Sequence, residues 1–303
     1  MIDLSVQIGS LKLKNPVLTA SGTFGYGAEY RDLMDVNQLG AVITKTVTLE
    51  PRDGNPMPRI AETPGGMLNS IGLANVGVER FIREKLPLLK ALNTNVIINV
   101  AGNTVEEYRK VVERLNEQDR IDGFEVNISC PNVEQGGLAF GTDPAITNKI
   151  VKKIKEVTRK TVIVKLTPNV TDIVAIAQAA VDGGADSLSL INTVLGMGID
   201  IQTRKPLLGR GIGGLSGPAI KPIALAKLYQ VATAVSVPLI GIGGIMSAED
   251  GMEFIIAGAT AVQVGTLTFV EPDGALKVLH GIEDFCQRSQ IKKITDLVGS
   301  LKE

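Results

Sequence analysis

The sequence is poor in the side chains on which many catalytic and structural sites depend. Its 303 residues include one histidine, His280, two cysteines, Cys130 and Cys286, and no tryptophan. A histidine base would have to be His280, and a zinc site of the usual Cys/His type has almost nothing to draw on. Two thiols cannot build a disulfide framework, and an iron–sulfur cluster needs about four thiolates.

An excess of charge of one sign and long apolar segments are also lacking. Lysine and arginine number 31 against 32 acidic residues, a net charge of −1, which gives no electrostatic basis for binding nucleic acid or an acidic membrane. No apolar run reaches the roughly 18 residues of a membrane-spanning helix, and no signal-peptide pattern opens the sequence. We therefore expect a cytoplasmic protein in a reducing compartment, with neither nucleic acid nor membrane as a partner.

What the chain does contain is an alternation of short apolar runs and helical patterns. The runs occupy residues 17–20, 41–44, 96–100, 123–127, 162–166, 187–191, 238–241 and 261–265. The helical patterns between them include residues 105–116, 145–159, 173–182, 219–235 and 248–257. This α/β pattern predicts a single (β/α)8 TIM barrel over residues 1–303. An open doubly wound sheet is the rival, but the turn after the first run lacks a dinucleotide fingerprint.

Three segments fall outside the alternation. Residues 4–14 alternate around Gly9 and Ser10, which predicts a short N-terminal β-hairpin. Residues 50–66 and 192–217 are long and irregular, and we expect them to form lids at the C-terminal face of the barrel. The G-x-G-x-x-G match at residues 209–214 neither follows a predicted strand nor opens a helix, so it predicts a flexible loop.

Polar groups follow almost every predicted strand, at the end where barrel active sites lie. They are Ser21, Lys45, Thr46, Asn99, Asn127, Ser129, Cys130, Asn132, Lys165, Asn192, Thr193 and Thr266. Carboxylates are scarce among them. This scarcity argues against hydrolysis by paired acids and against a divalent-metal cage, so no metal site is expected.

Glycines and lysines in this set indicate a site for anions. Gly243, Gly244 and Gly265 follow the last two strands, where glycine lets backbone N–H groups approach a phosphate; tight turns are the alternative. Lys165 lies inside an apolar strand, so its ammonium must meet an anion or lose its proton, with a structural salt bridge as the alternative. Lys45 invites the same argument. Together they indicate a phosphorylated cofactor or a carboxylate substrate that gains charge during reaction.

Cys130 is the candidate for proton transfer. A buried cysteine is usually a packing residue, but Cys130 follows the fourth strand in a polar loop between Ser129 and Pro131. Its thiol can accept a proton if nearby lysines lower its pKa. Cys286, in a helical pattern, is expected to fill core or surface space, and His280 is not expected to be catalytic.

These residues make the sequence resemble the dihydroorotate dehydrogenases, the FMN-dependent barrels of pyrimidine synthesis. The resemblance rests on residues 15–23, on Lys45 and Thr46, on Asn-Ser-Ile-Gly-Leu-Ala-Asn at residues 69–75, and on Val-Asn-Ile-Ser-Cys-Pro-Asn at residues 126–132. These motifs occur in the family's order across essentially the whole chain, so the resemblance is specific.

The resemblance implies a reaction and a set of site residues. Cys130 would remove a proton from C5 of dihydroorotate while hydride leaves C6 for the flavin, as desaturation beside a carbonyl requires. The residues implied to surround the substrate are Lys45, Asn69, Ser70, Ile71, Gly72, Leu73, Asn127, Asn192 and Thr193. Those implied to hold FMN are Ser21, Lys45, Thr46, Asn99, Asn127, Lys165, Ile191, Gly217, Gly243, Gly244, Gly265 and Thr266.

The resemblance also separates classes by their electron acceptor. The membrane-bound class has an amphipathic N-terminal extension and a serine base, neither of which this sequence displays. Of the two cysteine classes, one reduces fumarate as a homodimer. The other is the catalytic subunit of a heterotetramer whose partner carries FAD and a [2Fe–2S] cluster and reduces NAD⁺. Residues 22–27 and 69–75 resemble the second, which implies a homodimer core with one FMN per chain.

Three other functions stay open. A phosphate-binding barrel lyase or isomerase without flavin would use the glycines but leave Cys130 unexplained. A non-enzymatic flavin- or phosphate-binding scaffold would also leave Lys45 and Lys165 idle. A flavin barrel that reduces uridines in transfer RNA would need a basic face, which a net charge of −1 does not supply.

Overall fold

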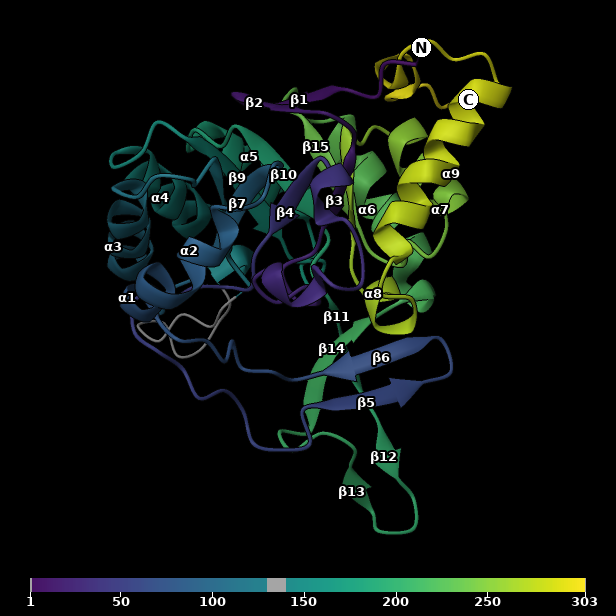
Figure 1. The fold of residues 1–303 in the computed structure, drawn as a ribbon. Coiled ribbons are helices and arrows are strands. Elements are labelled where there is room, and N and C mark those ends of the chain that lie inside the picture. Colours follow the sequence, from purple (N-terminus) through teal and green to yellow (C-terminus); the bar gives the residue numbers. More distant parts are fainter. Residues whose placement is uncertain (1, 130–139, 303) are drawn as a thin grey trace.

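The computed structural model describes residues 2–129 and 140–302. Eight parallel strands close into a barrel in the order β10-β15-β16-β3-β4-β7-β8-β9 (Figure 1), which confirms the predicted (β/α)8 architecture. In chain order they are β3 (Val17–Thr19), β4 (Ala41–Ile43), β7 (Asn95–Val100), β8 (Gly123–Asn127), β9 (Thr161–Leu166), β10 (Ser187–Leu190), β15 (Leu239–Ile242) and β16 (Ala261–Val264). Their side chains are almost all buried, as expected of a sheet covered on both faces.

Helices surround this barrel. They are α1 (Val78–Arg80), η3 (Phe81–Lys85), α2 (Leu86–Leu89), α3 (Val105–Asn116), α4 (Pro144–Lys155), α5 (Ile173–Asp182), α6 (Lys221–Ala232), α7 (Ala248–Ile256), α8 (Leu267–Val270) and α9 (Gly274–Arg288), with short turns η1 (Ala28–Tyr30), η2 (Val36–Gln38), η5 (Phe140–Thr142), η6 (Pro218–Ile220) and η7 (Ile294–Leu297). Thr104, Asp143, Asp172 and Ser247 cap α3, α4, α5 and α7 by accepting hydrogen bonds from first-turn amides. These caps fix where each helix leaves the preceding strand.

The amino end of the barrel is covered by the predicted hairpin, which the structure confirms. Strands β1 (Val6–Ile8) and β2 (Leu11–Leu13) pair antiparallel, and the side chains of Ile8 and Leu13 are fully buried. Thr161, at the start of β9, holds the turn: its Oγ1 accepts a hydrogen bond from the Ser10 amide (3.0 Å) and lies 2.8 Å from Ser10 Oγ. The hairpin is therefore anchored to the barrel by polar contacts and buried apolar side chains.

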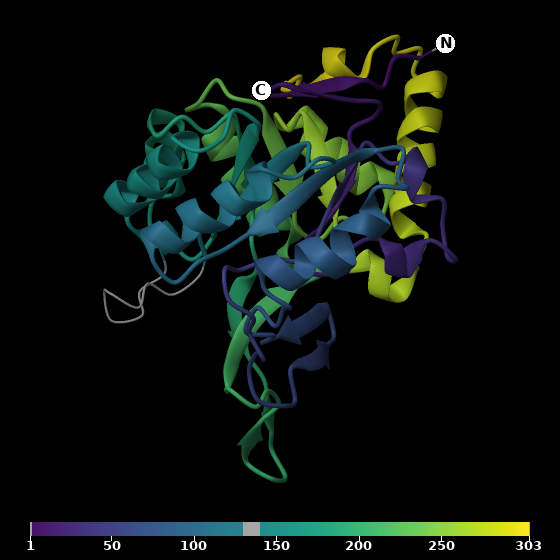
Figure 2. The same ribbon diagram turned by 60° about the vertical axis from the view of Figure 1, so that its left-hand side comes forward.

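At the opposite end, a four-stranded antiparallel sheet extends from the barrel, as Figures 1 and 2 show. We call it the cap sheet; in spatial order its strands are β11 (Val194–Met197), β14 (Ile212–Ser216), β6 (Gly66–Asn69) and β5 (Ile60–Thr63). A two-stranded tip, β12 (Ile199–Asp200) with β13 (Lys205–Pro206), extends from it. The two segments predicted to be lids thus meet in one sheet, although they are far apart in the sequence.

Two predictions about these segments are wrong, the first of them in part. Residues 51–59 are irregular as expected apart from an isolated bridge at Arg52, but residues 60–63 form β5 and most of residues 194–216 form strands. The G-x-G-x-x-G segment is not a flexible loop, because residues 212–216 form β14 between β11 and β6. The glycines serve close packing rather than flexibility. A Cβ on Gly213 would lie 2.4 Å from the Asn69 carbonyl oxygen, and one on Gly214 would lie 2.0 Å from Thr193 Oγ1. Glycine is therefore required where β14 passes against Asn69 and Thr193.

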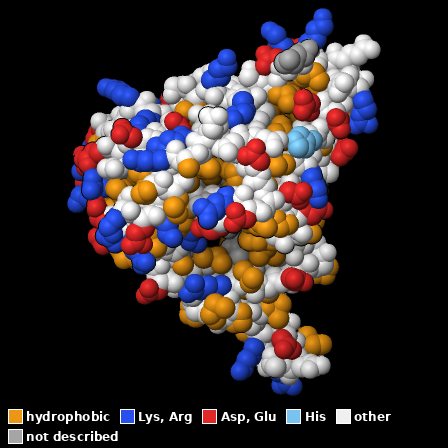
Figure 3. All heavy atoms as spheres, viewed as in Figure 1, with side chains coloured by type: hydrophobic (Ala, Val, Ile, Leu, Met, Phe, Trp, Pro, Cys, Tyr) orange, Lys and Arg blue, Asp and Glu red, His pale blue; other side chains and the backbone are white. Residues whose placement is uncertain are grey.

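The surface carries charges of both signs. On the face shown in Figure 3, lysine and arginine side chains are interspersed with aspartate and glutamate, and apolar side chains gather near the cap sheet. Exposed apolar residues in the cap sheet and the segments joined to it include Met57, Leu195, Ile201 and Ile212. Among the described residues, no helix has the length and apolarity needed to cross a lipid bilayer.

Candidate active site

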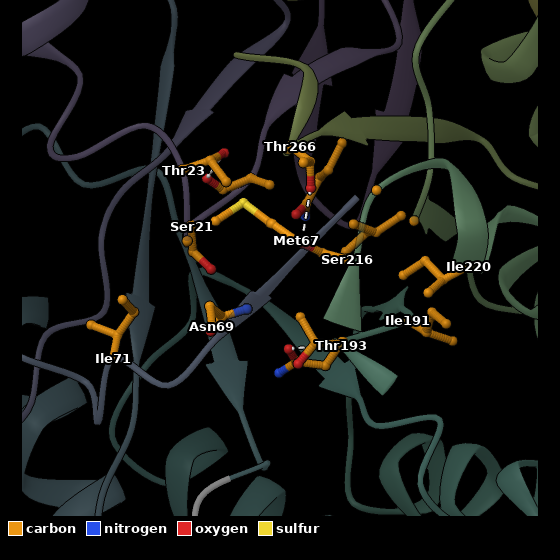
Figure 4. Close-up of a pocket in the computed structure, with 18 of the residues that line it drawn as sticks. Ser21, Thr23, Met67, Asn69, Ile71, Ile191, Thr193, Ser216, Ile220 and Thr266 are labelled. Carbon is orange, nitrogen blue, oxygen red and sulfur yellow. Dashed lines mark hydrogen bonds between the residues drawn. The ribbon is translucent and has the colours of Figure 1, made fainter. Parts of the chain in front are cut away.

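A pocket lies at the carboxyl ends of the barrel strands and is bordered by the cap sheet (Figure 4). Barrel active sites form at this end because the loops that follow the strands converge there. The cap sheet contributes Met67 and Asn69 from β6 and Ser216 from β14, and their side chains lie beside Ser21 and Thr193 from the barrel ends. The lining surface is mainly apolar, but polar side chains from most of the strand ends are set into it, so the pocket can bind and orient a polar small molecule.

The structure brings most of the predicted site residues to this pocket. Those that line it are Ser21, Lys45, Thr46, Asn69, Ile71, Leu73, Asn127, Lys165, Ile191, Asn192, Thr193, Gly217, Gly243, Gly244, Gly265 and Thr266. Ser70, Gly72 and Asn99 do not line it. Cys130, the predicted base, lies outside the described residues.

The three predicted residues that do not line the pocket lie just behind it. Ser70 Oγ accepts a hydrogen bond from Asn55 Nδ2 (2.8 Å). A Cβ on Gly72 would lie 2.6 Å from the backbone nitrogen of the same Asn55. Asn99 lies below the pocket, where its Oδ1 accepts a hydrogen bond from Thr46 Oγ1 (2.6 Å). These residues support the lining rather than form it.

A cluster of amides follows β8 and β10. Asn127 Oδ1 accepts hydrogen bonds from the Ser129 amide (3.1 Å) and from Asn192 Nδ2 (3.2 Å). Asn192 Nδ2 also contacts Ser129 Oγ (2.8 Å), and Asn192 Oδ1 accepts from the Thr193 amide (2.8 Å). Ser129 is the last described residue before Cys130. The amides thus cross-link the ends of two strands that are not neighbours in the barrel, which orients them toward the pocket.

Lys45 carries a cationic group into the pocket. Burial lowers the pKa of its ammonium from the ordinary value, Glu29 opposes this effect, and Arg59 adds to it. A partly buried ammonium gains most from an anionic ligand, because the ligand charge replaces the lost hydration. This part of the pocket therefore suits a carboxylate or another anion.

The opposite side of the pocket is built from glycine. Gly217, Gly243 and Gly244 have φ values of +100°, +128° and +75°, where L side chains are strained. A Cβ on Gly243 would lie 2.9 Å from Ala224 Cβ, and one on Gly244 would lie 2.7 Å from Lys221 Cβ. Beside them, Thr266 Oγ1 donates a hydrogen bond to Ser216 Oγ (3.0 Å), drawn as a dashed line below the Thr266 label in Figure 4. A backbone cradle with two hydroxyls is suited to a phosphate.

The floor of the pocket contains a lysine and two polar residues that the sequence did not single out. Lys165 Nζ lies 3.4 Å from Ser21 Oγ and 3.6 Å from Oε1 of Glu125, a fully buried carboxylate beneath the pocket. Lys165 thus has the carboxylate neighbour of the salt-bridge alternative, and it also lines the pocket, where an anionic ligand stays a prediction. Gln263, on β16, also lines the pocket, and its buried Oε1 has no hydrogen-bond partner among the described residues. The single polar residue inside each apolar strand was the available signal for both.

Most of the other lining residues that the sequence did not indicate are apolar. They are Ile60, Met67, Ala74, Ile220, Ile242, Ile245, Met246 and Phe269. Nothing in the local sequence distinguishes them from core residues, because only the tertiary structure brings them to the pocket. His280 and Cys286 lie on α9; His280 Nε2 is 3.3 Å from Gln38 Oε1, and Cys286 is buried in the core. Neither lines the pocket.

The fold and the site define a TIM barrel with a glycine cradle, cationic groups and an amide cluster at its carboxyl end. The chain belongs to the dihydroorotate dehydrogenase family, whose model matches residues 3–286. It is 56% identical over 299 residues to dihydroorotate dehydrogenase B (NAD(+)), catalytic subunit, of Geotalea uraniireducens (strain Rf4), with 99% of this chain and 98% of that protein covered. A protein of the same name from Alkaliphilus oremlandii (strain OhILAs) is 57% identical, with 99% of both chains covered.

Proposed function

We propose that this chain oxidises (S)-dihydroorotate to orotate with FMN, in de novo pyrimidine (UMP) biosynthesis, as the catalytic subunit of an NAD⁺-linked enzyme. The observation that carries the proposal is the convergence of Lys45, Asn69, Asn127, Asn192 and Thr193 beside a glycine cradle in one pocket. An anionic heterocycle with several carbonyl and N–H groups needs such a set of cationic and amide partners. Near-complete coverage at 56% identity by a named catalytic subunit supports the same conclusion.

The reaction removes two hydrogens from adjacent carbons. In this proposal the Cys130 thiolate accepts the C5 proton, and the C6 hydrogen leaves with its electron pair; the C5–C6 double bond forms from the electrons of the C5–H bond. Bound FMN supplies the acceptor for that hydride. Lys45 pairs with the substrate carboxylate, while the amide cluster holds the ring edge so that C5 faces the base.

The pocket fits FMN on two observations of this chain. At Gly217, Gly243 and Gly244 the pocket is lined by positive-φ backbone that carries no side chain, and the hydroxyls of Ser216 and Thr266 lie beside it, so this side suits the phosphate. At the floor, the unpaired Gln263 Oε1 calls for a donor, and the ammonium of Lys165 suits the part of the cofactor that gains negative charge.

Electrons must then leave the pocket. The relatives' names specify NAD⁺ and a catalytic subunit. We infer a partner subunit that carries FAD and a [2Fe–2S] cluster, arranged with a homodimer of this chain as a heterotetramer. Two cysteines in this chain are too few for the cluster, so its ligands have to come from the partner.

The proposal is tested with the purified chain under anaerobic conditions. We expect a yellow protein with bound FMN whose flavin absorbance bleaches when dihydroorotate is added. NAD⁺ reduction should require the co-expressed partner, and fumarate should not be reduced. A colourless protein would point to the flavin-free lyase or isomerase, and bound flavin that does not bleach would point to a scaffold. Fumarate turnover by the chain alone would move it to the homodimeric class.

A further inference from the structure

A buried carboxylate lies beneath the pocket and has no part in the reaction as written above. Glu125, in the middle of β8, is 0% exposed. Burying a carboxylate is costly unless charge and hydrogen bonds compensate it, so a glutamate inside a barrel strand requires an explanation.

Glu125 lies near the barrel axis. In the closed strand order, β8 and β16 are separated by three strands on either side, so they face each other across the barrel. Gln263 Nε2 on β16 nevertheless donates to Glu125 Oε2 at 2.6 Å. Since Asn127, two residues further along β8, lines the pocket, the carboxylate forms the layer directly below it.

The hydrogen bonds of Glu125 come from side chains on other barrel strands, and its charged neighbour, Lys165, lines the pocket. Oε1 accepts from Asn99 Nδ2 (2.6 Å), and Oε2 accepts from Ser189 Oγ (3.0 Å) as well as from Gln263. Lys165 Nζ stays 3.6 Å from Oε1. This separation exceeds the roughly 2.7–2.9 Å of a charge-assisted hydrogen bond, so the ammonium protons remain for other partners.

Gln263 gives an independent sign of a ligand. Because its Nε2 donates to the carboxylate, the orientation of the amide is fixed and Oε1 must point away from Glu125. Oε1 is buried, has no partner within residues 2–129 and 140–302, and belongs to a residue that lines the pocket. A buried acceptor without a donor is unfavourable, so a ligand N–H or O–H at this position would relieve the cost.

We propose that Glu125 is a positioning residue that sets the charge and orientation of the pocket floor. It turns the Gln263 carbonyl toward the cofactor and partly offsets the positive charge of Lys165. The inference rests on the proposed function in taking the cofactor as FMN. Its consequence is that Glu125 limits how strongly the pocket prefers the reduced, anionic cofactor over the oxidised one.

The test is the ratio of affinities for reduced and oxidised FMN, measured as the midpoint potential of the bound flavin. Glu125→Gln removes the negative charge at nearly constant volume. We expect the ratio to rise about tenfold, a positive shift of about 30 mV for two electrons. Lys165→Met should move it in the opposite direction. Asp186→Asn is the matched control, because it removes a carboxylate that pairs with Lys155 (2.8 Å) outside the pocket, and its potential should stay at the wild-type value.

If Glu125→Gln does not fold, the midpoint potential is measured in Ser189→Ala instead. It leaves the carboxylate one donor short, so its charge acts more strongly and the ratio should fall about threefold. In addition, Gln263→Met should weaken FMN binding to the apoprotein about tenfold. Wild-type potentials in Glu125→Gln and Ser189→Ala, with FMN bound, overturn the proposal. Wild-type protein that binds no FMN overturns the proposed function instead, so the two failures are distinguishable.

Discussion

Two lysine–carboxylate pairs differ in their role. We assign Lys155 and Asp186, outside the pocket, to stability, and Lys165 and Glu125, at the pocket floor, to function. Lys155 and Asp186 are partly exposed and lie in contact at 2.8 Å, and Asp186 Oδ2 also accepts a hydrogen bond from the Val162 amide. Lys165 and Glu125 are far more buried, with side-chain exposures of 7% and 0%, but their separation is 3.6 Å. Burial favours close pairing because unpaired charge costs more away from water, so the order is the reverse of the simple expectation.

The difference indicates that the ammonium of Lys165, in the deeper pair, has a second partner, which is the ligand of the pocket. Asp186 satisfies Lys155 and the barrel backbone, and that pair is complete within the chain. Lys165 instead contacts Glu125 and also lines the pocket, as does Gln263, whose Oε1 has no partner in the part of the chain that the structure describes. Polar groups that remain incompletely satisfied at the carboxyl end identify the part of the molecule built for a ligand.

The largest effect is expected from Cys130→Ala. This variant should keep FMN but lose substrate-driven flavin reduction at neutral pH by a factor of about 10²–10⁴, the usual contribution of a positioned base. Anaerobic stopped-flow absorbance measures it. Cys286→Ala is the control, since Cys286 lies in the core, where burial raises the pKa of its thiol. Unimpaired reduction in Cys130→Ala would remove the cysteine from the mechanism.

Gly243→Ala should have the next largest effect. The substitution strains a backbone at φ +128° in the cradle and places a Cβ 2.9 Å from the Cβ of Ala224, on α6 behind it. We expect FMN to bind the apoprotein about tenfold more weakly in a fluorescence titration. Gly211→Ala is the control: its φ is +83° but its nearest atom is 3.9 Å away, on Pro206 outside the pocket. Equal loss of FMN affinity in both variants would show that backbone strain, rather than the cradle, is responsible.

The pH dependence of substrate binding should follow Lys45. Because burial lowers the pKa of its ammonium, Lys45 loses its proton at a lower pH than an ordinary lysine does. The positive charge opposite an anionic substrate is then lost as pH rises, so KM should increase about three- to tenfold between about pH 7 and 10, with less change in kcat. Lys45→Arg stays charged over this range and should show a flat KM. A parallel rise in both proteins would assign the titration to another group.

The barrel could be predicted from the sequence because each part of the pattern was local. Buried parallel strands read as continuous apolar runs, and Thr104, Asp143, Asp172 and Ser247 mark the starts of helices. The residues at the strand ends could be predicted for the same reason, since a polar residue that follows a parallel strand lies at the carboxyl end of the barrel. Most candidate residues therefore fall at the pocket.

The cap sheet could not be predicted, because its pairing is not local. Strand β14 pairs with β6, and Gly214 and Asn69 are opposite each other although 145 residues separate them. The glycines that permit this approach read as flexibility when only their neighbours in sequence are known. Glu125 was missed for a related reason: its partners Asn99, Ser189 and Gln263 come from three other strands and meet only inside the closed barrel.

The smallest effect on flavin chemistry is expected at the amino end, from Thr161→Val. The hydroxyl of Thr161 accepts from the Ser10 amide and contacts Ser10 Oγ, so its loss leaves these groups without their partner. Thermal unfolding should show a loss of about 1–3 kcal/mol. FMN content, midpoint potential and reduction rate should stay at wild-type values. Ser10→Ala removes only the hydroxyl contact and should cost less stability. A changed potential in Thr161→Val would show that the two ends of the barrel are coupled, and the separation drawn from the two ion pairs would fail.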